Sequence, residues 1–151
     1  MKLRFDSDRR GGFALSVALI SLFVLACEKG PPVDTNPLDL DLDAMTKLPS
    51  GLLLLDLEVG EGELADSGST AQVGYTGYFT SGDVFDSGSF SFTVGAGQVV
   101  PGFDQGIAGM KVGGKRQLVI PSQLGYGDQD MGPIPGGSTL VFVVKLQSVS
   151  R

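Results

Sequence analysis

The residue types in this sequence decide which chemistry it can perform. Its 151 residues include no histidine, no tryptophan and one cysteine. A Ser-His-Asp triad, a Cys-His dyad, a histidine-ligated zinc site and an internal disulfide therefore cannot be built within one copy of the chain. Much acid–base chemistry is excluded with them. Nine phenylalanines and three tyrosines are its only aromatic residues.

Two short patterns imitate a ligand site. Aspartates at 39, 41 and 43 have the spacing of the first ligands of a calcium loop, but Ala44 and Ser50 stand where that loop needs glycine and glutamate. The segment 60–65 imitates a dinucleotide-binding turn, but its glutamates would face the phosphates, and a turn at 66–69 follows where a helix is required. We therefore expect neither a metal nor a cofactor.

Charge and glycine content narrow the class of protein further. The net charge is −6 and the sequence pI is about 4.4. A nucleic-acid-binding protein needs a basic face to neutralise phosphates, so we expect no nucleic-acid partner. The 23 glycines are about twice the average share, which indicates a β-rich domain with many tight turns.

The N-terminal 26 residues are typical of an export signal. Four basic residues lie within 1–10, and an uncharged apolar run follows at 13–26. That run is too short to span a bilayer core, which needs about 20 residues, but it fits a signal-peptide core. Cys27 directly follows this run, and residues 24–27 form the sequence Val-Leu-Ala-Cys, which resembles a bacterial lipobox. We expect residues 1–26 to be a lipoprotein signal peptide and Cys27 to be lipidated, which would place the protein at the bacterial cell envelope.

The composition of the segment 27–49 indicates a tether. It is acidic, contains several prolines and lacks aromatic residues, so we expect an extended linker between membrane and domain. Removal of residues 1–26 would leave seven basic and fifteen acidic residues and a net charge of −8.

Residues 50–151 alternate short apolar runs with Gly, Ser and Asp, the pattern of an antiparallel β domain. Phe103, Ile107 and Met110 form one apolar stripe at helical spacing, so we expect a short helix there that depends on packing against the sheet. The predicted structure is a curved antiparallel sheet wrapped around this helix, with strands at 52–59, 70–79, 91–94, 115–121 and 139–149.

Six phrases together resemble the FKBP-type peptidyl-prolyl cis-trans isomerases. They are VGYTGYF at 73–79, VFDS at 84–87, FSFTVGAGQVVPGF at 90–103, GIAGMKVGGKRQLVIP at 106–121, LGYG at 124–127 and IPGGSTLVF at 134–142. The resemblance runs from about residue 51 to residue 149. It implies an α+β fold in which a twisted antiparallel half-barrel of five to six strands wraps around one short α-helix.

The resemblance also implies a proline-binding pocket. Its expected catalytic residues are Tyr75, Phe85, Asp86, Val100, Phe103, Tyr126 and Phe142, and its expected substrate-binding residues are Phe90, Val99 and Ile134. The pocket floor, usually tryptophan in this family, is Phe103, and the segment between Asp86 and Phe90 is shorter than in many relatives. For Asp86 an ordinary turn-capping role is an alternative.

This resemblance implies a peptidyl-prolyl isomerase, and together with the predicted export signal it implies that the substrates are proline-containing exported polypeptides. An apolar pocket can lower the barrier to rotation about an Xaa-Pro bond by desolvating it and binding its twisted form. The alternative is a catalytically weak proline-peptide-binding or chaperone module that is tethered at the cell envelope. We expect a monomer.

Overall fold

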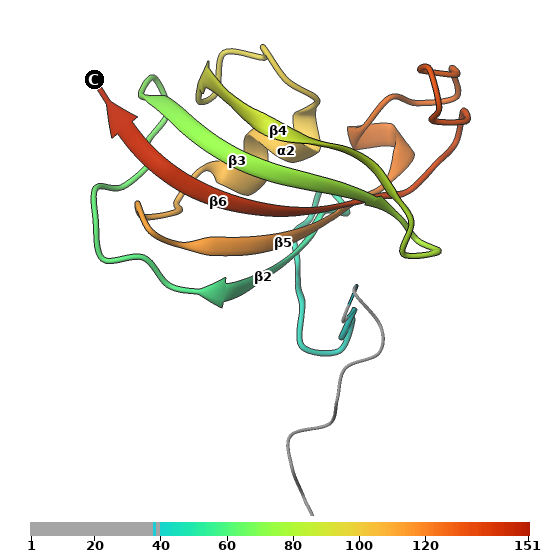
Figure 1. Cartoon of the computed structure of the whole chain (residues 1–151), viewed down its shortest axis with the longest axis horizontal. Coiled ribbons are helices and arrows are strands. Elements are labelled where there is room, and N and C mark those ends of the chain that lie inside the picture. The colour runs from blue at the N-terminus through green and yellow to red at the C-terminus, as the bar shows by residue number, and fades with distance from the viewer. Residues whose placement is uncertain (1–37, 39) are drawn as a thin grey trace, which may run out of the picture. The chain divides into compact units, whose positions relative to one another are not determined.

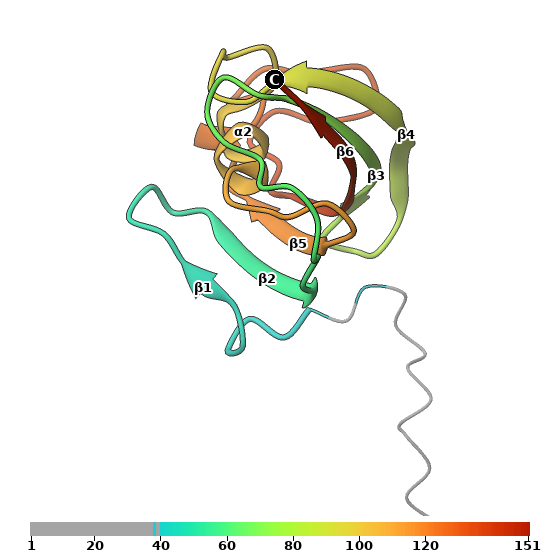
Figure 2. The same ribbon diagram turned by 90° about the vertical axis from the view of Figure 1, so that its left-hand side faces the viewer.

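The computed structural model describes Leu38 and residues 40–151 of the chain. Six strands form one antiparallel sheet in the order β1-β2-β5-β6-β3-β4. Figure 1 shows this sheet with helix α2 against one face, and Figure 2 shows how the sheet curls around that helix. The strands are β1 (Thr46–Lys47), β2 (Leu53–Glu58), β3 (Thr70–Phe79), β4 (Val84–Thr93), β5 (Lys115–Ile120) and β6 (Leu140–Ser150). The helices in the described residues are α2 (Pro101–Ile107) and the 3-10 turn η1 (Ser122–Leu124). This arrangement confirms the predicted fold class.

Alternation of side chains along the central strands builds the core. In β5 and β6, Leu118, Ile120, Phe142 and Val144 point to the face that packs against α2, and all four are buried. Burial of this apolar face provides the main stabilisation of the sheet. The apolar runs at 118–120 and 140–144 in these strands are the reason that their positions could be predicted from the sequence.

Helix α2 begins two residues earlier than predicted and ends three residues earlier. Pro101 occupies its first turn, where the missing N–H costs nothing, and Gly109 follows its end with a φ of +85°. Gly106 lets the helix approach the sheet closely, because a Cβ there would lie 2.5 Å from the Leu118 side chain. The predicted stripe of Phe103, Ile107 and Met110 is buried even though Met110 lies beyond the helix.

Strand β4 is much longer than the predicted strand at 91–94. It lies at the edge of the sheet, and within the described residues it pairs with β3 alone, along nine register positions. Most of its residues are exposed, so the sequence has little hydrophobic alternation there. Pairing with β3, rather than a local pattern, determines this strand.

Residues from the predicted tether pack on the sheet. Leu38 and Met45 are buried against Val119 and Val141, on the face opposite to the one that contacts α2. Strand β1 pairs with β2 at the edge of the sheet. The expectation of an extended linker up to residue 49 therefore differs from the structure for residues 40–49, because its scattered apolar side chains find a complementary face. No helix in residues 40–151 is long and apolar enough to cross a membrane. The predicted signal peptide at 1–26 and lipidation of Cys27 lie outside the described residues.

Candidate functional site

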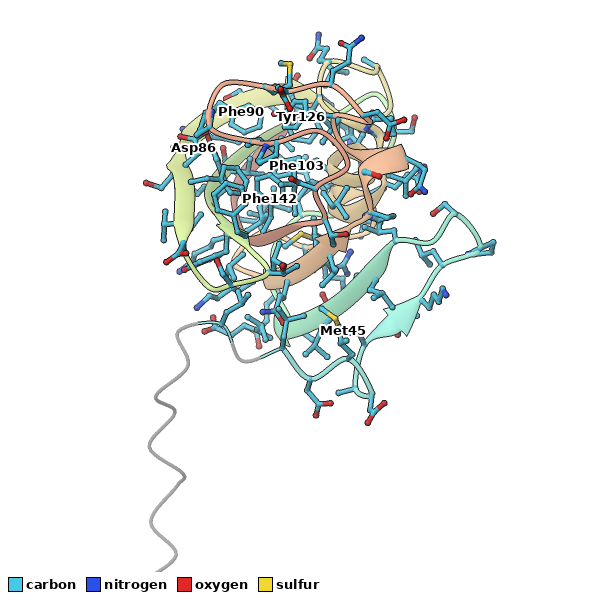
Figure 3. All side chains as sticks on the ribbon, turned by 90° about the vertical axis from the view of Figure 1, so that its right-hand side faces the viewer. Met45, Asp86, Phe90, Phe103, Tyr126 and Phe142 are labelled. Carbon is cyan, nitrogen blue, oxygen red and sulfur yellow. The ribbon has the colours of Figure 1, made fainter. Side chains whose placement is uncertain are left out.

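A pocket of about 750 Å³ lies among α2, strands β3 and β4, and the loop that follows η1. Figure 3 shows five of the predicted site residues, Asp86, Phe90, Phe103, Tyr126 and Phe142, gathered around this region. The structure brings all ten predicted pocket residues into its lining: Tyr75, Phe85, Asp86, Phe90, Val99, Val100, Phe103, Tyr126, Ile134 and Phe142. Their individual roles remain predictions.

Aromatic rings form the base of the pocket. Phe103 from α2 and Phe142 from β6 are 3% and 5% exposed, and their ring centroids lie 5.4 Å apart in an edge-to-face arrangement. Tyr75 from β3 lies edge-on to Phe103 and to Phe90, at 6.3 Å and 5.4 Å. Such edge-to-face pairs fix ring orientations, so the base of the pocket is preorganised.

An irregularity in the sheet places Phe85 at the pocket wall. The register of β3 with β4 shifts between Gly77 and Tyr78, which leaves Phe85 as the extra residue of a bulge. Gly77 provides the space, because a Cβ there would lie 2.5 Å from the Phe85 ring and 3.0 Å from the Phe142 ring. The glycine and the bulge together let two aromatic rings approach the backbone of β3.

Asp86 belongs to strand β4 and contacts the aromatic base of the pocket. Its Oδ2 accepts a hydrogen bond of 2.6 Å from the Tyr75 hydroxyl, and its Oδ1 accepts one of 2.9 Å from the Ser87 N–H. Asp86 does not cap a turn, because the turn between β3 and β4 lies at 80–83. The alternative reading of this residue as a turn cap is therefore wrong.

The hydrogen bond to Asp86, together with burial and the negative charge of Asp86, raises the pKa of Tyr75 to about 12. Because the folded-state pKa lies above the ordinary value of about 10, Tyr75 stabilises the fold below that pH, and this contribution is lost as the pH rises towards 12. We expect ultraviolet titration of tyrosinate to show a step near pH 12. Tyr75→Phe should remove it, and Asp86→Asn should move it to lower pH. An unchanged step in Asp86→Asn would contradict the assignment.

The segment 95–100 forms a second wall and is held by side chains. The Asp104 carboxylate accepts hydrogen bonds from the Gly95 N–H at 2.6 Å and the Gly97 N–H at 3.2 Å. Gln98 Oε1 accepts another from the Thr93 N–H at 2.8 Å. The N–H of Val100 donates no hydrogen bond within the described residues. A free backbone donor therefore lies in a wall of the pocket.

The loop between η1 and β6 forms the outer rim. Tyr126 and Met131 line the pocket and are 38% and 47% exposed. Reciprocal backbone hydrogen bonds of 2.8 Å and 3.0 Å join Met131 and Ile134 in a tight turn, which buries the Ile134 side chain. The rim is therefore apolar and partly open to solvent.

Four lining residues were not predicted: Gly97, Gln98, Met131 and Pro133. Gly97 and Gln98 lie inside the phrase at 90–103, so their position beside Val99 was the available signal. The turn that places Met131 and Pro133 has no hydrophobic periodicity to predict it. Within residues 40–151, no group of three or more Asp, Glu, Cys or His side chains is arranged to hold a metal ion.

Comparison with known proteins gives a consistent result. A model of the FKBP-type peptidyl-prolyl cis-trans isomerases matches residues 61–147. The FK506-binding protein of Streptomyces anulatus is 44% identical over 109 residues, which cover 67% of this chain and 88% of that protein. FK506-binding protein 4 of Rhizopus delemar is 49% identical over 110 residues. The match covers 70% of this chain but only 29% of that protein. The crystal structure of AtFKBP13 is 36% identical with a TM-score of 0.66, covering 70% of this chain and 98% of that one. The chain therefore belongs to the family of FKBP-type peptidyl-prolyl cis-trans isomerases.

Proposed function

We propose that this chain catalyses cis-trans isomerisation of Xaa-Pro bonds in exported polypeptides. The observation that carries the proposal is an aromatic pocket with a free backbone donor, the Val100 N–H, in its wall. Such a pocket suits a proline ring, and the donor suits the carbonyl that precedes it. Membership of the family supports the same activity.

The reaction requires rotation about a bond with partial double-bond character. Its barrier is about 18–20 kcal/mol, and water stabilises the planar form by hydrogen bonding to the carbonyl. Transfer into an apolar pocket removes that solvation. If the pocket binds the twisted form more tightly than either planar isomer, rotation becomes faster without a covalent step.

The pocket residues have different roles in binding the substrate. Phe103 and Phe142 provide the floor on which the proline ring packs, and the Val100 N–H donates to the carbonyl before proline. The Tyr126 hydroxyl lies at the open rim, where it can hydrogen-bond to the same region of substrate. Asp86 has an indirect role. Its carboxylate accepts the hydrogen bond of the Tyr75 hydroxyl and thereby fixes the orientation of the Tyr75 ring, which borders the floor.

An NMR exchange assay on a short Ala-Pro peptide, with the full chain in mild detergent, tests the proposal. We expect catalysis above the uncatalysed rate, and a roughly three- to tenfold lower kcat/KM in Tyr126→Phe because one hydrogen bond is lost. Tyr78→Phe is the matched control, because Tyr78 packs on the opposite face of the sheet. Tight peptide binding without turnover would support the alternative of a binding module. If the chain showed no binding and no turnover, both functions would be overturned.

The proposed location is the bacterial envelope, with the chain attached through lipid on Cys27. The export signal and the cysteine that follows it support this proposal, and two or three acyl chains anchor a protein stably, at about 0.8 kcal/mol per buried CH₂. In a bacterial host, labelled palmitate should enter the protein and the protein should sediment with membranes. Cys27→Ser should abolish incorporation of the label. Label that still enters this variant would contradict the anchor.

A further inference from the structure

A second hollow lies beside the pocket and is called the side groove here. It has a volume of about 490 Å³, and its lining includes the apolar residues Val94, Val99, Pro101 and Ala108. Val94 is 1% exposed, whereas Pro101 and Ala108 are exposed at the rim. The side groove is thus an accessible apolar hollow between α2 and the end of β4.

The side groove lies next to the pocket. Gly97 and Val99 line both hollows, so a short stretch of backbone separates them. A Cβ at Gly97 would meet no atom within 4 Å. No atom of the described residues therefore obstructs that position, which leaves room at Gly97 for a polypeptide that reaches from the pocket towards the side groove.

The walls of the side groove are held in place. The Gly68 N–H donates to the Val94 carbonyl and the Val94 N–H donates to the Ser69 carbonyl, at 2.8 Å and 2.9 Å. Asp104 lies in the opposite wall and accepts the N–H groups of Gly95 and Gly97. Both oxygens of the one carboxylate in the lining are thus occupied by the protein. A preformed groove of this kind binds a flexible chain at a lower entropic cost.

We propose that the side groove binds an apolar side chain of the same polypeptide whose proline occupies the pocket. This inference rests on the proposed isomerase function and adds a substrate preference to it. The occupant is apolar because most of the accessible surface of the lining is apolar, although Ser67 and Gln105 add polar atoms at the rim, and it belongs to the substrate because the two hollows share Gly97 and Val99. The enzyme would therefore favour prolines that have a large aliphatic residue a few positions away.

Peptides that carry one leucine at successive positions on either side of proline, in an otherwise Gly/Ser/Ala sequence, test this inference. We expect one position at which leucine lowers KM about tenfold relative to alanine. Ala108→Trp should fill the side groove and remove that difference, and Ala108→Asp should do the same by placing a charge there. Ala108 is outside the lining of the pocket, so the short Ala-Pro peptide should be isomerised as before.

Ala44→Trp is the matched control, since Ala44 is an exposed alanine outside both hollows. It should keep the leucine preference. Equal KM values for all leucine positions, or a preference that survives both Ala108 variants, would overturn the side groove as a subsite while the short peptide is still turned over. If the unaltered chain did not isomerise the short Ala-Pro peptide at all, the proposed function itself would be overturned.

Discussion

Replacement of Phe103 by alanine is expected to lower the free energy of unfolding by about 3–5 kcal/mol and to remove most peptide binding. The first effect follows from the cavity left by a buried aromatic side chain. Phe103 is 3% exposed and contacts the rings of Tyr75, Phe90, Phe92 and Phe142. The second follows because the same ring lies at the base of the pocket. Urea unfolding and peptide titration by NMR measure the two effects.

A milder pair of variants separates stability from function. Phe103→Leu and Phe92→Leu remove neighbouring rings, 5.9 Å apart, that are equally buried. Both should destabilise the domain by similar amounts and leave it folded, because the apolar volume is largely retained. Phe92 does not line the pocket, so only Phe103→Leu should lower kcat/KM, by about tenfold or more. Equal losses of activity in the two variants would show that the Phe103 ring has no specific role in the floor.

The parts of the fold that could be predicted are those with a local pattern. Strand β3 begins with alternating exposed and buried residues at 70–73, strands β5 and β6 contain the apolar runs 118–120 and 140–144, and the stripe through Phe103 and Ile107 marks the helix. Strand β4 and residues 40–49 lack such a pattern. Their positions depend on a partner strand or on a complementary apolar face, and neither is visible in a single stretch of sequence.

For the pocket, too, the residues that belong to a local sequence pattern could be predicted, and the features that depend on pairing between strands could not. The ten predicted lining residues could be named because each lies in a phrase that resembles the family, whereas no single aromatic residue indicates a pocket by itself. The roles of Gly77 and the bulge at Phe85 could not be predicted, since they depend on register across two strands. The bond from Tyr75 to Asp86 likewise joins residues that become neighbours only when β3 pairs with β4.

Arg116→Met is expected to lower the free energy of unfolding by about 2–3 kcal/mol, the second large effect. The Arg116 guanidinium donates to both oxygens of Asp56, at 2.6 Å and 3.1 Å, and to the carbonyls of Gly106 and Ala108, at 2.9 Å and 3.4 Å. It therefore joins β2 to the end of α2, where a cation is favoured by the helix dipole. The Arg116 side chain is 10% exposed and the Asp56 side chain 40%. We place the loss below the 3–5 kcal/mol of a fully buried pair because water can solvate Asp56 in the variant.

A double-mutant cycle with Asp56→Ala identifies which partner matters. Asp56→Ala alone leaves a nearly buried guanidinium that has only carbonyl partners, so it should be at least as destabilising as Arg116→Met despite the exposure of Asp56. The double variant should cost less than the sum of the two, because no charge is left unpaired. Asp66→Ala provides the control, since the ion pair of Asp66 with Arg151 is exposed and should contribute at most about 1 kcal/mol. Strict additivity in the Arg116 and Asp56 cycle would show that the helix carbonyls, rather than the carboxylate, hold the guanidinium and through it the end of α2.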